Sequence, residues 1–326
     1  MLTLFLAFGA VYVIWGSTYL AIRVAVETIP PLLMIGTRFG VAGLLMYGWL
    51  RLRGRPAPSR RQWVQAVWIG TLMLGVGTGS VAWAEQYISS GLAALLVTTV
   101  PLWMVLLDWL WKGHTQPSAR LFTGLALGGL GIYLLVQPTL STDALAVGPG
   151  VILLVLLGAF SWSVTSIYAK TADRVEDPFV ASAMQMAGGG ATLIVVGLLL
   201  GEGRALDVAA ISQASFLGWA YLLVFGSFIA FSAYVWLNRN VSAAKVATYA
   251  YVNPVVAVVL GAWLLDETVT AQMLLAMVLL LAAVALLSLP AHVFAPASTF
   301  LQRMAKTRTL SPAATPTPAP CPNEPC

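Results

Sequence analysis

Two charged side chains, Arg38 and Glu85, lie inside long apolar runs of the sequence. If those runs cross a membrane, an unpaired charge is costly there, so charges at depth are usually paired, face a cavity or act in function. Three roles are therefore open for these residues. They are a structural ion pair at an outer gate, direct contact with a substrate carboxylate, and proton transfer by Glu85.

Aromatic residues recur at helical spacing in the first apolar run. Tyr12, Trp15, Gly16, Tyr19 and Arg23 occupy positions i, i+3, i+4, i+7 and i+11, which lie on one face of a helix. This face is either one wall of an aromatic, amphipathic binding cavity or an aromatic belt at the membrane surface with a close helix contact at the glycine.

The apolar run 148–169 is unusually polar for a membrane segment. Its second half contains Trp162, which matches Trp15 in position and favours the cavity, together with the hydroxyl residues Ser161, Ser163, Thr165, Ser166 and Tyr168. Serine and threonine can bond to a carbonyl of their own helix. At this density, however, we expect some of the hydroxyls to line a cavity.

Pro101 and Pro254 interrupt two further apolar runs. A proline inside a helix removes one backbone hydrogen bond and frees a carbonyl, and in lipid such breaks are expected where a helix faces protein or a wet cavity. Thr98, Tyr249 and Asn253 stand beside these prolines. We interpret both prolines as hinges next to a site, with static kinks as the alternative.

Motifs for other chemistry are absent from the sequence. It has no His-Glu-x-x-His pair, no Gly-x-Ser-x-Gly elbow, no phosphate-binding loop and only two histidines. Its two cysteines, Cys321 and Cys326, stand near the end, and two thiols without histidines make half a zinc site. We expect no enzyme activity, no cofactor and no metal. Without a phosphate-binding loop, any energy that the protein uses would come from a gradient rather than from ATP.

The composition makes lipid the solvent of this chain. Hydrophobic residues form 59% of the 326 positions, charged residues form 9%, and the mean hydropathy is +0.86, whereas about a quarter of the residues of soluble domains are charged. A soluble fold would lack polar faces to cover the apolar surface. The net charge of +5 does not indicate nucleic acid, because the basic residues stand in short gaps between apolar runs.

Ten apolar segments approach the length of about 20 residues that a membrane helix needs. We predict an all-α integral membrane protein with ten transmembrane helices at 3–22, 31–50, 63–85, 90–111, 120–138, 148–169, 178–200, 214–237, 243–265 and 270–290. Cytoplasmic loops collect lysine and arginine, so the stretch from Arg51 to Arg61 and Lys170 would face the cytoplasm, and Asp143 and Glu202 would face outward. Both termini are then cytoplasmic.

The two halves of the sequence have matching residues at a constant spacing. Asn253-Pro254 follows Val100-Pro101, and Ser242 follows Ser89, at the same offset of 153 positions. Each copy holds five segments, and because five is odd the second copy must enter the membrane inverted, as in many secondary transporters. The predicted domains are repeats at 1–138 and 148–290 and a disordered cytoplasmic tail at 291–326, whose proline-rich composition cannot form a core.

These features resemble the drug/metabolite transporter superfamily, and within it the EamA-type exporters built from two five-helix repeats. The resemblance covers roughly residues 5–289 and rests on the order of its motifs. In the first copy these are Trp15-Gly16-Ser17-Thr18-Tyr19, Arg38-Phe39, and Ser89-Ser90-Gly91 running into Pro101. In the second copy they are Trp162, Tyr234-x-Trp236, Ala243-Ala244, Asn253-Pro254 and Asp266-Glu267-Thr268.

The resemblance implies a secondary carrier of the bacterial inner membrane that exports small organic metabolites, amino acids or amphipathic drugs by alternating access. Together with the charges, the periodicity and the proline breaks, it predicts hinges at Pro101 and Pro254 and a cavity with eleven residues. These are Trp15, Tyr19, Arg38, Trp83, Glu85, Thr98, Trp162, Thr165, Tyr234, Tyr249 and Asn253. The expected partners are a small-molecule substrate and the lipid bilayer, without nucleic acid, and the chain is a monomer or a homodimer.

Other functions remain as alternatives. A nucleotide-sugar or sugar-phosphate carrier of the same superfamily is less favoured, because diphosphate recognition usually needs several basic side chains and Arg38 is nearly the only deep one. A non-transporting membrane scaffold and an intramembrane enzyme are the alternatives of another class.

Overall fold

The computed structural model of the chain describes residues 2–107, 109–110, 119–141, 148–169, 175–241, 246 and 249–288. All regular structure in these ranges is helical. The predicted tail at 291–326, with Cys321 and Cys326, lies outside the described residues, and so do Asp143, Lys170 and Ser242.

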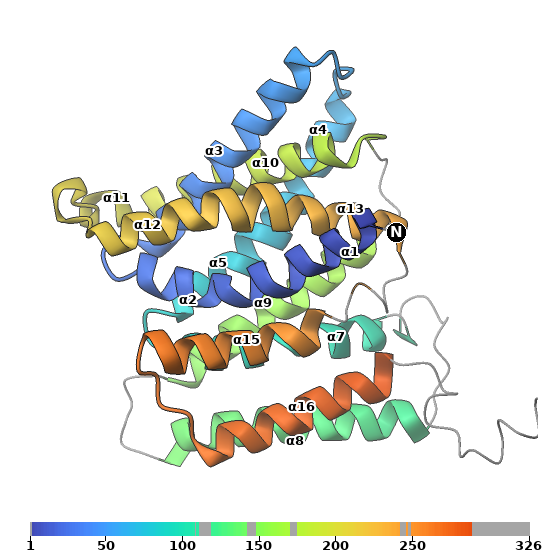
Figure 1. The fold of residues 1–326 in the computed structure, drawn as a ribbon, viewed down its shortest axis with the longest axis vertical. Coiled ribbons are helices and arrows are strands. Elements are labelled where there is room, and N and C mark those ends of the chain that lie inside the picture. The colour runs from blue at the N-terminus through green and yellow to red at the C-terminus, as the bar shows by residue number, and fades with distance from the viewer. Residues whose placement is uncertain are drawn as a thin grey trace, which may run out of the picture. The chain divides into compact units, whose positions relative to one another are not determined.

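The helices follow one another with short connections (Figure 1). The first half contains α1 (Leu2–Gly9), η1 (Ala10–Ile14), α2 (Trp15–Ala25), α3 (Pro31–Leu52), α4 (Arg60–Gly70), η2 (Thr71–Thr78), α5 (Gly79–Ala84), α6 (Ser90–Val97), α7 (Val100–Leu107) and α8 (Ala119–Ser141). The second half contains α9 (Pro149–Tyr168), α10 (Pro178–Leu199), α11 (Glu202–Ala205), η4 (Val208–Ala210), α12 (Gln213–Tyr221), η5 (Leu222–Phe231), α13 (Ser232–Asn240), α15 (Tyr249–Leu264) and α16 (Ala271–Ser288).

Seven helical stretches among the described residues are long and apolar enough to cross a membrane. They are Leu2–Ala25, Pro31–Leu52, Arg60–Ala84, Ser90–Leu107, Pro149–Tyr168, Pro178–Leu199 and Gln213–Asn240, and shorter apolar helices occur at Ala119–Leu135, Val252–Leu264 and Ala271–Leu286. The described part of the chain is therefore all-helical, as predicted, and its helices are consistent with a membrane protein. The count of ten crossings and the inversion of the second half stay predictions.

Several helices begin at residues that favour a helix start through their own local chemistry. Pro31, Pro149 and Pro178 each occupy the start of a helix, where the amide hydrogen that proline lacks would have no helical partner. At α4, Ser59 and Gln62 bond to each other's backbone in a capping box.

The helices form layers between two closely packed pairs. In Figure 1, α3 and α10 lie at one end and α8 and α16 lie at the other, with α2, α5, α9, α13 and α15 between them. Glycines permit the close approach of α3 and α10, because a Cβ on Gly190 would collide with the backbone of Gly40, and one on Gly36 would lie 2.9 Å from the backbone nitrogen of Ile194. Gly36 and Gly40 of α3 thus lie directly against α10.

Three of the long helical stretches contain a π-helical segment, namely η1, η2 and η5. A π turn holds more residues than an α turn and leaves the ordinary hydrogen-bond ladder, and such turns are frequent at functional sites. Each π segment continues directly into an α-helix. Near the middle of these three stretches, the side chains therefore point in other directions than those of a continuous α-helix would.

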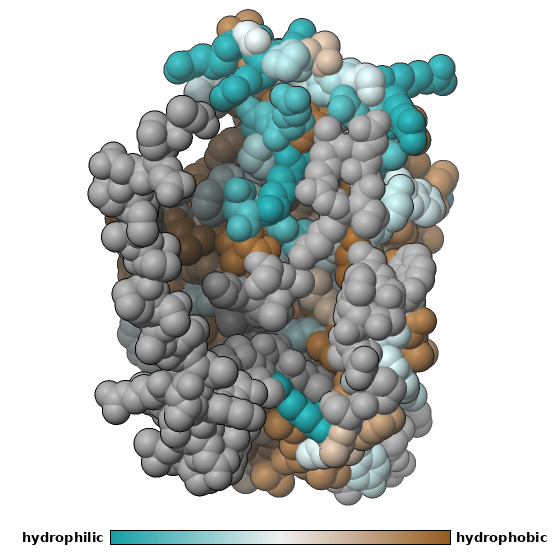
Figure 2. Space-filling view, turned by 90° about the vertical axis from the view of Figure 1, so that its right-hand side faces the viewer, coloured by the Kyte–Doolittle hydropathy of each residue, from teal (hydrophilic) through white to brown (hydrophobic). Residues whose placement is uncertain are grey.

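The loops at one side of the helices carry an ion pair and an arginine bound to backbone. Figure 2 shows this side, with hydrophilic residues gathered toward the end where α3 and α4 are joined. Arg55 Nε lies 3.1 Å from Asp177 Oδ2, and Arg239 Nη1 donates to the carbonyls of Val175 and Glu176 at 2.7 and 3.0 Å. These contacts connect the α3–α4 loop and the end of α13 to the segment before α10.

Candidate functional site

A cavity of about 80 Å³ lies between helices from both halves of the chain. By this measure a single water needs about 10–15 Å³, so the space is larger than a packing defect. From the first half it is lined by Trp15, Thr18, Tyr19, Ile22, Arg38, Phe39, Leu74, Gly77, Thr78, Val81, Val97 and Val100. From the second half it is lined by Gly158, Ala159, Trp162, Gly226, Phe231, Tyr249 and Asn253.

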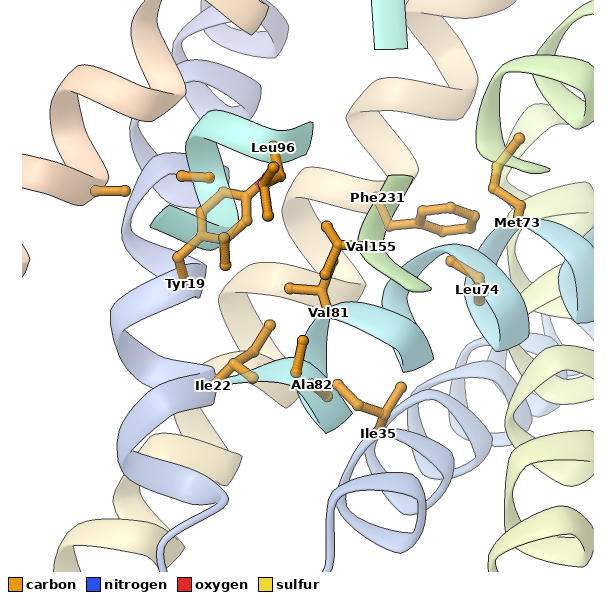
Figure 3. Packing of buried hydrophobic residues seen from close by; sticks show 14 of the residues in the cluster. Tyr19, Ile22, Ile35, Met73, Leu74, Val81, Ala82, Leu96, Val155 and Phe231 are labelled. Carbon is orange, nitrogen blue, oxygen red and sulfur yellow. The ribbon is translucent and has the colours of Figure 1, made fainter. Parts of the chain in front are cut away.

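The apolar walls of the cavity come from several helices. Figure 3 shows Tyr19 and Ile22 projecting from α2, Val81 from α5, Leu74 from η2 and Phe231 from η5. All five side chains are buried. The walls are therefore aromatic and aliphatic, which suits a ligand with an apolar body.

Four aromatic rings form one cluster at the cavity. Trp15 lies 5.6 Å from Trp162, 4.9 Å from Tyr234 and 5.4 Å from Tyr249, measured between ring centroids, and Trp162 lies 5.4 Å from Tyr234. Centroid distances of 4.5–7 Å are those of favourable ring pairs. We call Trp15, Trp162, Tyr234 and Tyr249 the ring cluster.

The ring cluster separates the cavity from a second, smaller cavity of about 30 Å³. Trp15, Trp162 and Tyr249 border the first cavity, whereas Tyr234 borders the second, whose lining includes Gln185, Asn238 and Arg239. The hydroxyl of Tyr234 is held by Ser166 at 2.9 Å and by the indole nitrogen of Trp162 at 3.3 Å. The ring cluster, which touches both linings, is thus held together by hydrogen bonds as well as by ring contacts.

Arg38 is the one charged side chain among the described residues that line the first cavity. It is 3% exposed, and its Nε and Nη1 atoms are buried without a hydrogen-bond partner in the described structure. Its Cζ atom lies 4.3 Å from the centroid of the Phe39 ring, a distance at which a cation is attracted to an aromatic face.

The ion pair between Arg38 and Glu85, one of the roles left open by the sequence, is not formed. Both residues are described and buried, yet no nitrogen of Arg38 comes within 4.0 Å of an oxygen of Glu85. Both carboxylate oxygens of Glu85 are buried without a hydrogen-bond partner in the described residues, and its backbone carbonyl accepts a bond from Arg23 Nη1 at 2.8 Å. The two charges occupy neighbouring but separate places.

The structure brings Trp15, Tyr19, Arg38, Trp162, Tyr249 and Asn253 to the first cavity and Tyr234 to the second. The other predicted residues lie outside both linings in the described structure. The hydroxyls of Thr98 and Thr165 bond to their own helices, through the carbonyls of Ala94 at 3.0 Å and Ser161 at 2.6 Å. Trp83 packs 5.0 Å from the ring of Tyr87, and Glu85 lies beyond the wall.

The two predicted hinges differ. The helix is interrupted just before Pro101, between α6 and α7, whereas Pro254 lies inside the continuous helix α15. The carbonyl of Val100 accepts a bond from the Ser163 hydroxyl at 3.1 Å. A break in the helix therefore accompanies Pro101, whereas α15 continues through Pro254.

Side chains of neighbouring helices serve carbonyls in the π segments. The amide of Asn253, oriented by its hydrogen bonds, donates to the Tyr12 carbonyl of η1 at 3.0 Å. The Ser161 hydroxyl of α9 donates to the Leu72 carbonyl of η2 at 2.9 Å, whereas in η5 the Ser227 hydroxyl of the same segment donates to the Leu222 carbonyl at 3.1 Å. The polar character of α9 is thus partly explained by backbone groups of its neighbours.

Several lining residues were missed by sequence reasoning. Gly77 and Gly226 belong to π segments, whose changed facing breaks the 3.6-residue period. Phe39 and Phe231 pair at 6.1 Å across two helices, and only Phe39 carried a signal, as the neighbour of Arg38. No group of three or more His, Cys, Asp or Glu side chains within the described ranges is placed to hold a metal.

Comparison with known proteins agrees with the sequence resemblance. The sequence model of the EamA-like transporter family matches residues 1–137 and 149–289. YedA of Escherichia coli K12, named as an uncharacterized inner membrane transporter, is 42% identical over 273 residues, which cover 83% of this chain and 85% of YedA. YoaV of Bacillus subtilis strain 168, named as an uncharacterized transporter, is 23% identical over 289 residues, which cover 86% and 94%.

A solved crystal structure matches the fold with a TM-score of 0.62 and 19% identity, over 87% of this chain and 96% of the other. At this identity the likeness concerns the fold alone. The family resemblance predicted from the motifs is confirmed by the match to both segments and by the 42% identical relative. The chain belongs to the EamA-like transporter family and is a membrane transporter.

Proposed function

We propose that this transporter is a secondary carrier that exports small organic metabolites, amino acids or amphipathic drugs by alternating access. Its membrane is the bacterial inner membrane, which the name of the relative YedA supports, and both termini lie in the cytoplasm. The observation that carries the proposal is the first cavity, which takes its lining from both matched segments and includes Trp15, Trp162 and Tyr249 of the ring cluster.

Alternating access needs two bodies that move against each other around a central site. Two inverted five-helix repeats would supply them, and ten transmembrane helices follow from that arrangement. The packing supports this proposal, since the second helices of the two segments, α3 and α10, pack together, and so do their last helices, α8 and α16. Such pairs at equivalent places are expected when two similar halves face each other.

The cavity chemistry supports amphipathic substrates over nucleotide sugars. Aromatic rings contact apolar bodies well, and a single guanidinium accommodates one anionic group, whereas a diphosphate usually requires several basic side chains. Arg38 is the one charged residue among the described lining residues. A nucleotide-sugar or sugar-phosphate carrier is therefore the less supported alternative.

Counterflow in reconstituted vesicles tests the proposal. The full chain is placed in liposomes loaded with excess unlabelled amino acid, and we expect uptake of labelled L-phenylalanine or L-leucine against its total gradient. Trp162→Ala removes a ring of the cavity and should lower this uptake severalfold. Trp263→Ala, at a side chain that is 75% exposed, is the matched control and should leave it unchanged.

Two results would contradict the carrier. One is a lack of counterflow for the whole panel of amino acids, organic metabolites and amphipathic drugs. The other is chemical conversion of a substrate without any flux, which would support an intramembrane enzyme.

A further inference from the structure

We propose that the first cavity is an anion site in which Arg38 binds the carboxylate of a small molecule with an aromatic or branched apolar body. This inference rests on the proposed carrier function and adds the charge of its substrate. It joins three observations, namely the unsatisfied guanidinium, the lack of an acid in the described lining, and the apolar walls around one charge.

Two nitrogens of the Arg38 guanidinium, Nε and Nη1, are buried without a hydrogen bond from the described residues. Removing a charged group from water is costly unless it is paired and hydrogen-bonded, and here Nε and Nη1 have no partner among the described residues. Other arginines of the described structure are bound, Arg23 to a carbonyl, Arg239 to two carbonyls and Arg55 to a carboxylate. Arg38 differs because it is buried, lines the cavity and has two nitrogens without such a partner.

The surroundings of Arg38 leave its donors available to a ligand. The guanidinium is placed over the Phe39 ring at 4.3 Å, and Gly226 faces it, since a Cβ at that glycine would stand 3.6 Å from Nη1. Glu85 does not approach within 4.0 Å. A planar guanidinium presents parallel N–H groups that match the two oxygens of a carboxylate.

The rest of the cavity determines the other end of the ligand. Apolar and aromatic walls are supplied by Tyr19, Phe231, Trp15, Trp162 and Tyr249. With one cation and no acid among the described lining residues, a ligand with one negative charge and an apolar body satisfies the site. A ligand of the same shape that bears only an amine places two positive charges together and is excluded.

Equilibrium binding to the purified full chain tests this inference. The probes are labelled 3-phenylpropionate and 4-methylpentanoate, with 2-phenylethylamine and 3-methylbutylamine as amines of matching shape. We expect the wild type to bind the carboxylates and the amines not to compete. Arg38→Gln should weaken carboxylate binding about 10- to 100-fold, the range for losing a hydrogen bond to a charged group.

Two further variants separate charge from shape and folding. Arg38→Lys keeps the charge but loses the paired N–H groups, so its affinity should lie between those of the wild type and Arg38→Gln. Arg204→Gln removes the same charge at an exposed position and should bind like the wild type. Thermal unfolding of each variant confirms that it is folded.

Equal binding of carboxylates and amines, wild-type affinity in Arg38→Gln, or no carboxylate binding to the wild type would each overturn the anion site. Failure of the carrier itself has a different signature. In that case carboxylates bind in an Arg38-dependent manner, but labelled 3-phenylpropionate shows no counterflow in vesicles. Counterflow of the amines alone would keep the carrier and reject the anion site.

Discussion

Glu267 binds the beginning of α6 through Ser90. Its carboxylate accepts a bond from the Ser90 backbone nitrogen at 2.8 Å and from the Ser90 hydroxyl at 2.9 Å. Glu202 does the same for α3, accepting bonds from the backbone nitrogens of Leu32 and Leu33 at 3.1 and 2.8 Å. In both cases an acid from the second matched segment satisfies the free amides at the start of a helix in the first.

We expect Glu267→Ala to lower the stability of the folded protein by about 1 kcal/mol, the usual cost of removing a cap from a helix start. Thermal unfolding in detergent measures the change. Glu176→Ala, at an exposed position, removes the same charge and should have little effect. Equal effects of the two substitutions would show that net charge, rather than the cap, is responsible.

The ring of Tyr234 is expected to block the movement of a solute between the two cavities. Tyr234→Ala removes the ring that borders the second cavity and should raise the passive leak of labelled 3-phenylpropionate from preloaded vesicles. Tyr234→Phe keeps the ring, so leak should stay low, while the lost hydroxyl contacts with Ser166 and Trp162 should cost about 1 kcal/mol of stability. A leak as large in Tyr234→Phe as in Tyr234→Ala would contradict this role of the ring.

Glu85 was the proton-carrier candidate from the sequence, but it lies outside both described cavity linings. Arg23, Arg38, Glu267 and Tyr19 are the titratable or charged groups that act on it. We expect the rate of counterflow to depend on pH in the same way in Glu85→Gln and in the wild type, measured from about pH 5 to 8. Loss of the wild-type pH dependence in this variant would instead identify Glu85 as the proton carrier.

The inverted arrangement predicts that two loops lie on opposite sides of the membrane. With Cys321 and Cys326 replaced by serine, single cysteines are introduced by Pro58→Cys and Asp143→Cys. In intact cells we expect an impermeant thiol reagent to label position 143 but to label position 58 only after lysis. Labelling of both positions from the same side would reject the odd number of crossings in the first segment.

The sequence was sufficient for the helical membrane character and for the start of several helices. Those features depend on composition and on local chemistry, such as the prolines at 31, 149 and 178. The capping box of Ser59 was not predicted, and it starts α4 at Arg60, ahead of the predicted start at 63. The aromatic face of the first run also placed Trp15 and Tyr19 at the cavity, because the period of 3.6 residues holds within α2.

The remaining parts of the site depend on contacts between distant helices. The π segments have the same apolar composition as the α-helices beside them, so no periodicity distinguished Gly77 or Gly226 as lining residues. Ser161 bonds to a carbonyl of η2, a partner that sequence alone does not reveal. Arg38 and Glu85 were correctly singled out as buried, but their separation requires the relative positions of two helices.

The π segment η5 lets this stretch of helix absorb a change in chain length. A π turn closes over one residue more than an α turn, so deletion of one residue within η5 leaves an α turn there and keeps α13 in its orientation relative to α12. The same deletion within the α-helix α13 before Tyr234 would turn the residues after it by about 100° and bring a different side chain to the place where the Tyr234 ring meets Trp15. Loss of one residue is therefore tolerated in the π segment but alters the ring contacts when it falls in the α-helix that follows.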